Sequence, residues 1–534
     1  MKLFDSSVYL GPWPGSAETF SDVNALVNKL GQLNIHAALV NHTLAWQHNP
    51  YYGNKLLMDE IREHPQLEAC WGLTPGPALE VYGGLTGLKK ALIENKIRAI
   101  RLFPKDHVVS LEQWMTGGFF DLLNKLSIIV FLDVDQVFMQ VGIYDYDANR
   151  FSAIKEICQS YPNISLVINR TGYRPYQSLI QLMQQCDNLY LDLSFLATHQ
   201  GVEDIVQRFG SARLLFGTSM PFVEAGGAIA RLTYAGIPEE AKRDIASSNL
   251  ERMLQNAKTS QHDQQRNFEM VAPEVSQMPK HSYHVIDAHG HMGPYFKFHI
   301  PQNDSEGMLR AMDSAGVEIA CISSHLAISG DWKRGNLETL AAIRKHPSRL
   351  KGHVVINPNH PRDIKPELKR YILDEGFIAI KITPDTHLKS ILDRDYEPMW
   401  EFAADHKIMV LSHTYHGSPY DDPQLFAEIA ERHPEVNVLI VHSGALTEGF
   451  EGAIHLAQKY PNLYLDISGS FITSHWIERL VNEAGDDKVV YSSDIPFIDI
   501  RYSLGRVLYS QLSEYQKTRL LRENIIQITK RIEE

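Results

Sequence analysis

The sequence has few cysteines and no long apolar run. Its four cysteines show no C-x-x-C spacing, which excludes a disulfide framework and a zinc knuckle. No stretch reaches the roughly 20 apolar residues that a membrane-spanning helix needs. The opening residues, MKLFDSSVYL, contain no apolar core of a signal peptide. We therefore expect a cytoplasmic protein whose thiols are reduced.

Positively charged residues are fewer than negatively charged ones, with 51 Lys and Arg against 64 Asp and Glu. The chain of 534 residues has a formal net charge of −13, and no basic stretch offsets it. This balance argues against nucleic acid or an anionic membrane as a partner and leaves a small-molecule substrate as the expected one. No predicted strand is followed by a Gly-rich phosphate-binding fingerprint, which disfavours a doubly wound nucleotide-binding fold.

The chain contains one sequence pattern twice, with an offset of about 280 residues. The matching blocks include LFDSSVYLGPW and VIDAHGHMGPY, IRAIRLFPKDH and FIAIKITPDTH, and NLYLDLS and NLYLDIS. A repeat of this length is too long for a solenoid unit. The sequence therefore predicts two homologous domains, residues 1–255 and 283–534, joined by a polar linker over residues 256–282.

Short β-branched runs alternate with amphipathic helical patterns in each copy. The runs are almost continuously apolar, as is typical of strands that are buried on both faces. Eight βα units in about 250 residues predict a (β/α)₈ TIM barrel for each copy, with an open doubly wound sheet as the alternative. Strands of the second copy are predicted near Val285–Met292, Ile319–Ser323, Gly352–Ile356, Phe377–Ile382, Ile408–His413, Asn437–His442, Leu463–Ile467 and Lys488–Ser493.

Polar residues with metal-binding or catalytic chemistry lie at the ends of these predicted strands. They are His289 and His291 (strand one), Lys381 (strand four), His413 (strand five), His442 (strand six) and Asp494 (strand eight). Catalytic groups of TIM barrels occupy the C-terminal ends of the strands. Three imidazoles, of His289, His291 and His413, with the Asp494 carboxylate form a ligand set suited to zinc or a similar divalent ion.

The first copy has different residues at the same six positions. They are Ser7, Tyr9, Arg101, Asp133, Arg170 and Ser219. Serine, tyrosine and arginine offer no nitrogen ligand, so the first copy is expected to be free of metal. Asp133 is expected to pair with an arginine as a polar plug, because buried charges are costly unless paired. The alternative is a guanidinium that binds a small anion.

Histidines that occur in both copies are expected to have structural roles. On this basis His325 is paired with His42 of the first copy. Two aspartates, Asp287 and Asp466, also occur in both copies and are expected to support the fold or to hold metal ligands in place.

The blocks DAHGH, AIKITP, LSHT, VHSG and SSDIPF of the second copy resemble strand-end motifs of the amidohydrolase superfamily. The resemblance is to the branch that includes aminocarboxymuconate-semialdehyde decarboxylase. It implies that His289, His291, His413 and Asp494 bind one metal ion, and that His442 is catalytic. It further implies that Lys381 is a substrate or structural lysine and is not carbamylated. Many members of this branch pair barrels as homodimers, so the tandem fusion is expected to imitate that dimer within one chain, with a homo-oligomer as the alternative.

The sequence thus predicts an enzyme that hydrolyses a small-molecule amide, ester or lactone with the help of one divalent ion, expected to be zinc. Asp494 would accept a proton from the attacking water, His442 would orient the carbonyl group, and Lys381 would hold a substrate carboxylate. One alternative is a non-oxidative decarboxylase that uses the same residues. Another is a non-catalytic metal-binding sensor.

Overall fold

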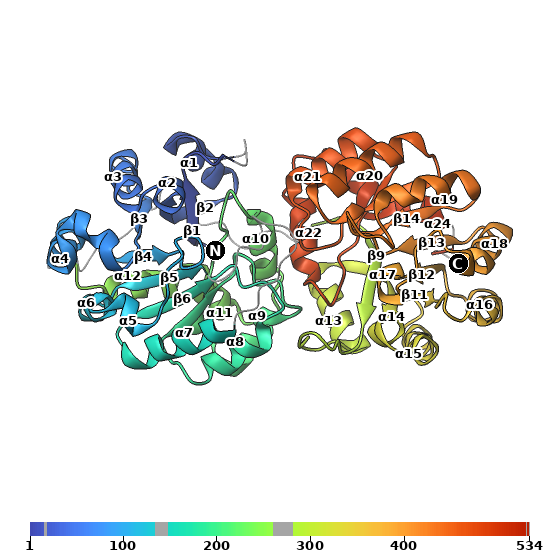
Figure 1. Cartoon of the computed structure of the whole chain (residues 1–534), viewed down its shortest axis with the longest axis horizontal. Helices are drawn as coiled ribbons and strands as arrows, with labels where there is room; N and C mark the ends of the chain where they lie inside the picture. Colours follow the sequence, from blue (N-terminus) through green and yellow to red (C-terminus); the bar gives the residue numbers. More distant parts are fainter. Residues whose placement is uncertain (15–18, 134–147, 260–280, 530, 533–534) are drawn as a thin grey trace. The chain divides into compact units, whose positions relative to one another are not determined.

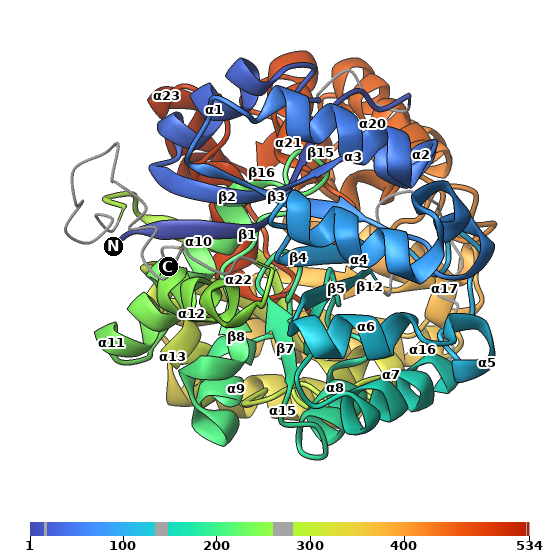
Figure 2. The same cartoon turned by 90° about the vertical axis from the view of Figure 1, so that its left-hand side faces the viewer.

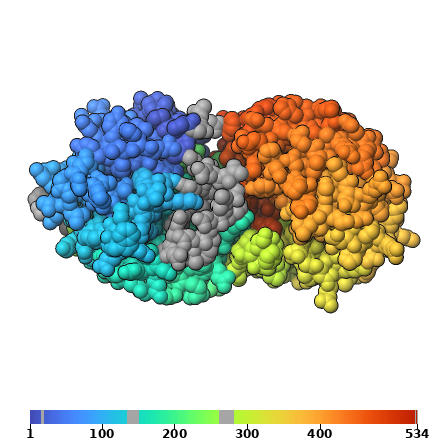
Figure 3. Space-filling view, viewed as in Figure 1, coloured from blue at the N-terminus to red at the C-terminus, as the bar shows by residue number. Residues whose placement is uncertain are grey.

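The structure is a computed structural model that describes residues 1–14, 19–133, 148–259, 281–529 and 531–532. The chain divides into two compact units, which correspond to the two copies of the repeat. Figures 1 and 3 colour the first unit from blue to green and the second from yellow to red. The predicted linker lies outside the described residues from 260 to 280, so its boundaries stay a prediction.

Each unit contains one parallel eight-stranded sheet whose strands follow one another in sequence order. The strands of the first unit are β1 (Leu3–Leu10), β2 (Ile35–His42), β3 (Leu67–Gly72), β4 (Ala99–Leu102), β5 (Ile129–Asp133), β6 (Ser165–Asn169), β7 (Leu189–Asp192) and β8 (Leu214–Leu215). Those of the second are β9 (Val285–Met292), β10 (Val317–Ser324), β11 (Leu350–Val355), β12 (Ala379–Ile382), β13 (Met409–Ser412), β14 (Val438–Ile440), β15 (Leu463–Asp466) and β16 (Val489–Val490).

Helices connect the strands and surround them, as Figure 2 shows for α3, α4, α6, α8 and α9 of the first unit. The α-helices of this unit are α1 (Val23–Gln32), α2 (Thr43–Gln47), α3 (Pro50–Glu60), α4 (Gly84–Glu94), α5 (Gln113–Thr116), α6 (Phe119–Leu126), α7 (Ala148–Ser160), α8 (Tyr176–Met183), α9 (Gly201–Phe209), α10 (Ala225–Thr233), α11 (Glu239–Arg243) and α12 (Asn249–Asn256). Those of the second are α13 (Ser305–Ala315), α14 (His325–Ser329), α15 (Trp332–Lys345), α16 (Pro361–Leu368), α17 (Pro384–His387), α18 (Glu397–His406), α19 (Phe426–Arg432), α20 (Thr447–Lys459), α21 (Ser474–Arg479), α22 (Ile500–Leu508), α23 (Glu514–Thr518) and α24 (Asn524–Thr529).

Backbone hydrogen bonds close each sheet into a barrel. The Tyr9 amide donates to the Met220 carbonyl at 2.8 Å in the first unit, and the Ala288 amide donates to the Tyr491 carbonyl at 3.0 Å in the second. The prediction of two tandem TIM barrels is confirmed. Within the described residues, no helix combines the length and the apolar character that a bilayer span requires.

An aspartate shared by both copies joins the first strand to the segment after the last one. Asp287 accepts hydrogen bonds from the Ser493 amide at 3.0 Å and from the His289 amide at 3.2 Å. Asp5 accepts from the Thr218 amide in the same way, at 3.0 Å. The expectation that this aspartate supports the fold agrees with these contacts, because they tie the two ends of the barrel together.

The two barrels also share an unusual backbone conformation where the site residues lie. His442 (φ 62°) and Asp494 (φ 63°) adopt the left-handed region, and so do their counterparts Arg170 (φ 53°) and Ser219 (φ 54°). Positive φ is uncommon for residues other than glycine. Because the first barrel keeps it without the histidine or the aspartate, the conformation belongs to the strand ends of this fold and is not imposed by the site.

Candidate metal and active site

Three predicted ligands meet at the C-terminal mouth of the second barrel. His289 and His291 point together from β9, with their Nε2 atoms 3.1 Å apart, and Asp494 Oδ1 lies 3.4 Å from His291 Nε2. Metal-ligating atoms of these residues lie within 4.8 Å of one another, and all three residues are buried. The alternation along the first strand therefore places both imidazoles as predicted.

The chemistry of this group fits a cation. Asp494 Oδ1 is a buried oxygen that has no hydrogen-bond partner among the described residues. Burial lowers the pKa values of His289 and His291 well below the usual range, so both rings stay neutral and offer a lone pair. Two facing imidazole nitrogens and an unpartnered carboxylate oxygen are the kinds of donor that a divalent ion takes.

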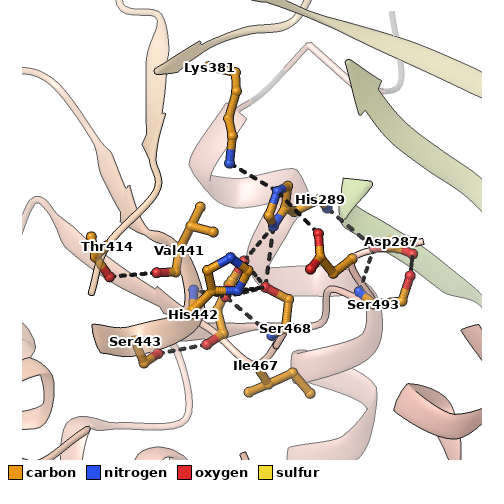
Figure 4. A network of polar contacts seen from close by, with 12 residues as sticks. Asp287, His289, Lys381, Thr414, Val441, His442, Ser443, Ile467, Ser468 and Ser493 are labelled. Carbon is orange, nitrogen blue, oxygen red and sulfur yellow. Dashed lines mark hydrogen bonds and ion pairs between the residues drawn. The ribbon is translucent and has the colours of Figure 1, made fainter. Parts of the chain in front are cut away.

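Neighbouring polar side chains contact the Nδ1 atoms of three histidines and so hold their rings in place. His289 Nδ1 lies 3.1 Å from Asp466 Oδ2, and His291 Nδ1 lies 3.0 Å from Ser323 Oγ. Ser468 Oγ lies 2.8 Å from His442 Nδ1, and Figure 4 shows it between His442 and His289. Such contacts fix the tautomer and the orientation of an imidazole, so that its Nε2 is left for the metal or the substrate.

His442 lies just after β14 and close to the ligands. Its ring centroid is 5.6 Å from that of His289 and 5.2 Å from that of His413. The backbone amide of His442 donates to Asp466 Oδ1 at 2.6 Å, so Asp466 positions two histidines at once. Burial lowers the pKa of His442 well below the usual range. A neutral imidazole held at this point can accept a hydrogen bond or a proton from a substrate group.

Lys381 enters the same cluster from β12. Its Nζ lies 2.9 Å from His289 Nε2, and the side chain is buried (Figure 4). Burial lowers the pKa of Lys381 to about 8, although the carboxylates of Asp494 and Asp466 act in the opposite direction. The amine is therefore in reach of whatever binds between the two histidines of β9.

His413, the third predicted imidazole ligand, follows β13 but is not among the residues whose ligand atoms meet within 4.8 Å around Asp494. Its Nδ1 lies 2.8 Å from Asp421 Oδ2 and 3.6 Å from Asp385 Oδ1. Burial alone would lower the pKa of His413, but the hydrogen bond to Asp421 and the charge of Asp385 raise it. The ring is thus held by Nδ1, which leaves Nε2 as the nitrogen that can serve as a ligand.

Two neighbouring aspartates allow this role of Asp421 to be tested. Asp421→Asn is expected to weaken metal binding by roughly 10- to 100-fold, because the amide no longer fixes the His413 tautomer. Asp422→Asn is the matched control, since Asp422 contacts His416 at 3.3 Å instead. Metal affinity is measured by competition with a chromophoric chelator. Equal affinities of the two variants would show that Asp421 does not position a ligand.

The pairing of His325 with His42 is wrong. His42 caps the N-terminus of α2, and the residue that caps the corresponding helix α14 is Ser324. The counterpart of His325 is therefore Thr43, one position further on. His325 is fully buried, its ring lies 5.3 Å from that of His291, and its Nε2 has no partner among the described residues. Because the first copy has a threonine at this position, a structural role of His325 can no longer be inferred from the repeat.

Sequence reasoning also missed His353 on β11, Ser323 and Asp421. His353 is fully buried, and burial together with the charge of Lys381 lowers its pKa to about 3. The sequence contains only weak signals for these three residues. Asp421 follows His413 by a short loop, and His353 lies inside a strand, where a buried histidine usually has a structural use.

The counterparts of the six predicted site residues form one buried polar network in the first barrel. Asp133 pairs with Arg101 at 3.0 Å and with Arg170 at 2.6 Å. The Tyr9 hydroxyl donates to Asp133 at 3.1 Å, and Arg101 donates to Ser7 Oγ at 3.0 Å. The chain continues from Ser7 to Ser219 at 3.1 Å. This is the arrangement of a polar plug, with both guanidinium groups on one carboxylate.

Aromatic side chains border this network. Trp46 stacks on Phe103 with ring centroids 4.8 Å apart, and the Arg170 guanidinium lies 4.8 Å from the Trp46 ring. Tyr9 and Trp13 belong to the same buried cluster. The place of the candidate metal ligands of the second barrel is thus occupied by ion pairs and aromatic rings in the first.

A sequence model of the amidohydrolase family matches the chain twice, over residues 24–255 and 286–528. None of the curated protein sequences matches this chain. Solved structures that resemble it include 2,6-dihydroxybenzoate decarboxylase from Rhizobium, with 18% identity, 46% of this chain and 99% of that chain covered, and a TM-score of 0.38.

Two further solved structures are similar to the chain. One is 5-carboxyvanillate decarboxylase from Sphingomonas paucimobilis, with 13% identity, 47% of this chain and 99% of that chain covered, and a TM-score of 0.40. The other is 4-oxalomesaconate hydratase from Rhodopseudomonas palustris, with 17% identity, 47% and 96% of the two chains covered, and a TM-score of 0.36.

Proposed function

Because the chain belongs to the amidohydrolase family, we propose that its second barrel is a metal-dependent hydrolase of a small-molecule amide, ester or lactone. The observation that carries the proposal is the buried convergence of His289, His291 and Asp494, with an unpartnered carboxylate oxygen. His413 would complete the ligand set, and zinc is the ion that this set of nitrogen and oxygen donors suits.

The residues of the second barrel have distinct roles in this proposal. A divalent ion, when bound, lowers the pKa of water to about 7. Asp494 accepts the proton of the attacking water and passes it to the leaving group. His442, held by Ser468 and Asp466, polarises and orients the reacting carbonyl group. Lys381 binds a negatively charged group of the substrate.

A metal analysis combined with a product screen tests the proposal. Protein purified without added metal is expected to contain close to one divalent ion per chain, because only the second barrel keeps the ligand set. Removal of the ion by a chelator is expected to abolish turnover, and added zinc is expected to restore it. Two ions per chain would contradict the mononuclear assignment. One bound ion without turnover of any amide, ester, lactone or carboxylic acid would favour a metal-binding sensor.

A non-oxidative decarboxylase is the second candidate, and the wall beside His291 favours it. Phe497 lies 5.3 Å from the His291 ring, and Tyr295 lies 4.7 Å from Phe497. Aromatic side chains next to the candidate ligands suit the ring of an aromatic acid. In such a reaction a side chain delivers a proton to carbon as CO₂ leaves. A screen that records CO₂ release beside hydrolysis products separates the two candidates.

We also propose that the substrate is a small molecule and that the protein uses neither nucleic acid nor a membrane as a partner. Its acidic net charge supports this part of the proposal. Sedimentation velocity measures directly whether the chain also forms a homo-oligomer.

A further inference from the structure

The first barrel has a groove on its outer side, away from the residues that correspond to the active site. Its volume is about 650 Å³, and its walls come from α3, β3 and α4, which lie next to one another in Figure 2. The lining includes Tyr51, Met58, Trp71, Tyr82, Ala91 and Ile97. Ligand pockets of proteins commonly have volumes of this size.

The second barrel provides a direct comparison for this groove. Cys70 pairs with Ala99 in the first barrel, and His353 pairs with Ala379 in the second, so β3 corresponds to β11 and β4 to β12. Ile97 precedes Ala99 by as many residues as Phe377 precedes Ala379, so these two residues correspond. Ala91 and Tyr371 correspond in the same way.

Large side chains fill the region in the second barrel. Tyr371 and Phe377 are buried, and their ring centroids are 5.0 Å apart. The Phe377 ring lies against Gly352, where an added Cβ would come within 2.8 Å of it. In the first barrel this glycine is replaced by Ala69, which lines the groove. The groove therefore exists where two aromatic rings have been exchanged for an alanine and an isoleucine.

The lining of the groove includes two aromatic rings, and one of them carries an unpaired hydrogen-bond donor. Trp71 and Tyr82 stack with centroids 6.1 Å apart and an interplanar angle of 27°. Asn54 holds Tyr82 by donating to its hydroxyl at 3.1 Å. The Trp71 Nε1–H is buried and has no hydrogen-bond partner in the described part of the chain. An unpaired buried donor is costly, so a ligand that accepts from it gains binding energy.

The charged residues that line the groove are Lys55, Asp59, Arg62, Glu68 and Lys96. Arg62 pairs with Asp59 at 2.6 Å, and Glu68 pairs with Arg98 at 2.8 Å. The floor itself carries aromatic and aliphatic side chains. This apolar part of the lining suits a planar ring.

We propose that this groove binds a small, planar aromatic compound. Its ring lies between the positions that Tyr371 and Phe377 occupy in the second barrel, against Trp71 and Tyr82. A ring nitrogen or carbonyl oxygen of the compound accepts the hydrogen bond from Trp71 Nε1. The site is separate from the proposed hydrolase site and does not depend on it.

Tryptophan indole resonances of the full-length protein test this inference, with quinoline as the probe. The chain has seven tryptophans, and Trp71→Phe identifies the signal of Trp71. A saturable shift of the Trp71 Nε1–H resonance is expected on addition of quinoline, with the signals of Trp13 and Trp46 unchanged. The Trp71→Phe variant is expected to bind quinoline about tenfold more weakly, because the donor is lost. Binding to this variant is measured from the line broadening of the quinoline signals.

The matched variant restores the residues of the second barrel. Ala91→Tyr with Ile97→Phe is expected to fill the groove and to weaken quinoline binding at least tenfold, while the other six indole signals keep their positions. Ile97→Phe alone serves if the double variant does not fold. A shift of Trp71 that persists unchanged in the filled variant, or no saturable shift in the wild type, would overturn the inference. Neither result bears on metal binding or turnover by the second barrel.

Discussion

Turnover is expected to fall by about 10²- to 10⁴-fold in both Asp494→Ala and His442→Ala, but only the first variant is expected to lose its metal ion. Asp494 supplies a buried carboxylate oxygen 3.4 Å from His291 Nε2, so its removal takes away a ligand and the proton acceptor together. His442 is held through Nδ1 beside this group and is assigned to the substrate. Its loss therefore leaves the ion in place.

Metal content by mass spectrometry and steady-state kinetics on the substrate found in the screen check this prediction. Ser219→Ala is the matched control, because Ser219 is the counterpart of Asp494 in the first barrel and has the same left-handed backbone. The Ser219→Ala variant is expected to change neither the metal content nor the turnover. An Asp494→Ala variant that retains a full equivalent of metal would refute the ligand assignment. Loss of the ion in His442→Ala would move His442 from the catalytic residues to the ligands.

Arg170→Ala is expected to destabilise the protein by about 3–5 kcal/mol, since it breaks a buried ion pair and leaves Asp133 with one partner fewer. Both side chains of this pair are almost fully buried, at 1% and 4% exposure, and the distance is 2.6 Å. For a domain of this size the change corresponds to a fall of roughly 10 °C in the melting temperature. Scanning calorimetry and urea titration measure the effect.

An exposed pair in the same barrel is the control for Arg170→Ala. Lys90 and Glu94 lie 3.7 Å apart at 75% and 61% exposure, so Lys90→Ala is expected to cost well below about 1 kcal/mol. The plug also predicts that formate and phosphate leave the melting temperature of the wild type unchanged. A rise with either anion that disappears in Arg170→Ala would instead indicate an anion site in the first barrel.

The sequence by itself determined the duplication, the barrel fold and where most of the candidate site residues lie in the barrel. Apolar runs that are buried on both faces repeat with the spacing of βα units, and the closed sheet brings the ends of all its strands together. His289, His291 and Asp494 could therefore be placed at one mouth although more than half of the second copy separates them. The same reasoning located Arg101, Asp133 and Arg170 in one cluster of the first barrel, where the structure shows them in contact.

Only the tertiary structure decided which side chains besides Asp466 hold the rings. Asp421, for example, lies on a loop whose path the periodicity of the sequence does not specify. Asp421 reaches His413 across such a loop, and the helix cap that shifts the counterpart of His325 from His42 to Thr43 is visible only in the backbone. The groove of the first barrel likewise depends on side-chain volumes summed over two helices and a strand. Such volumes are set by packing between distant segments, which a single sequence records only as ordinary apolar residues.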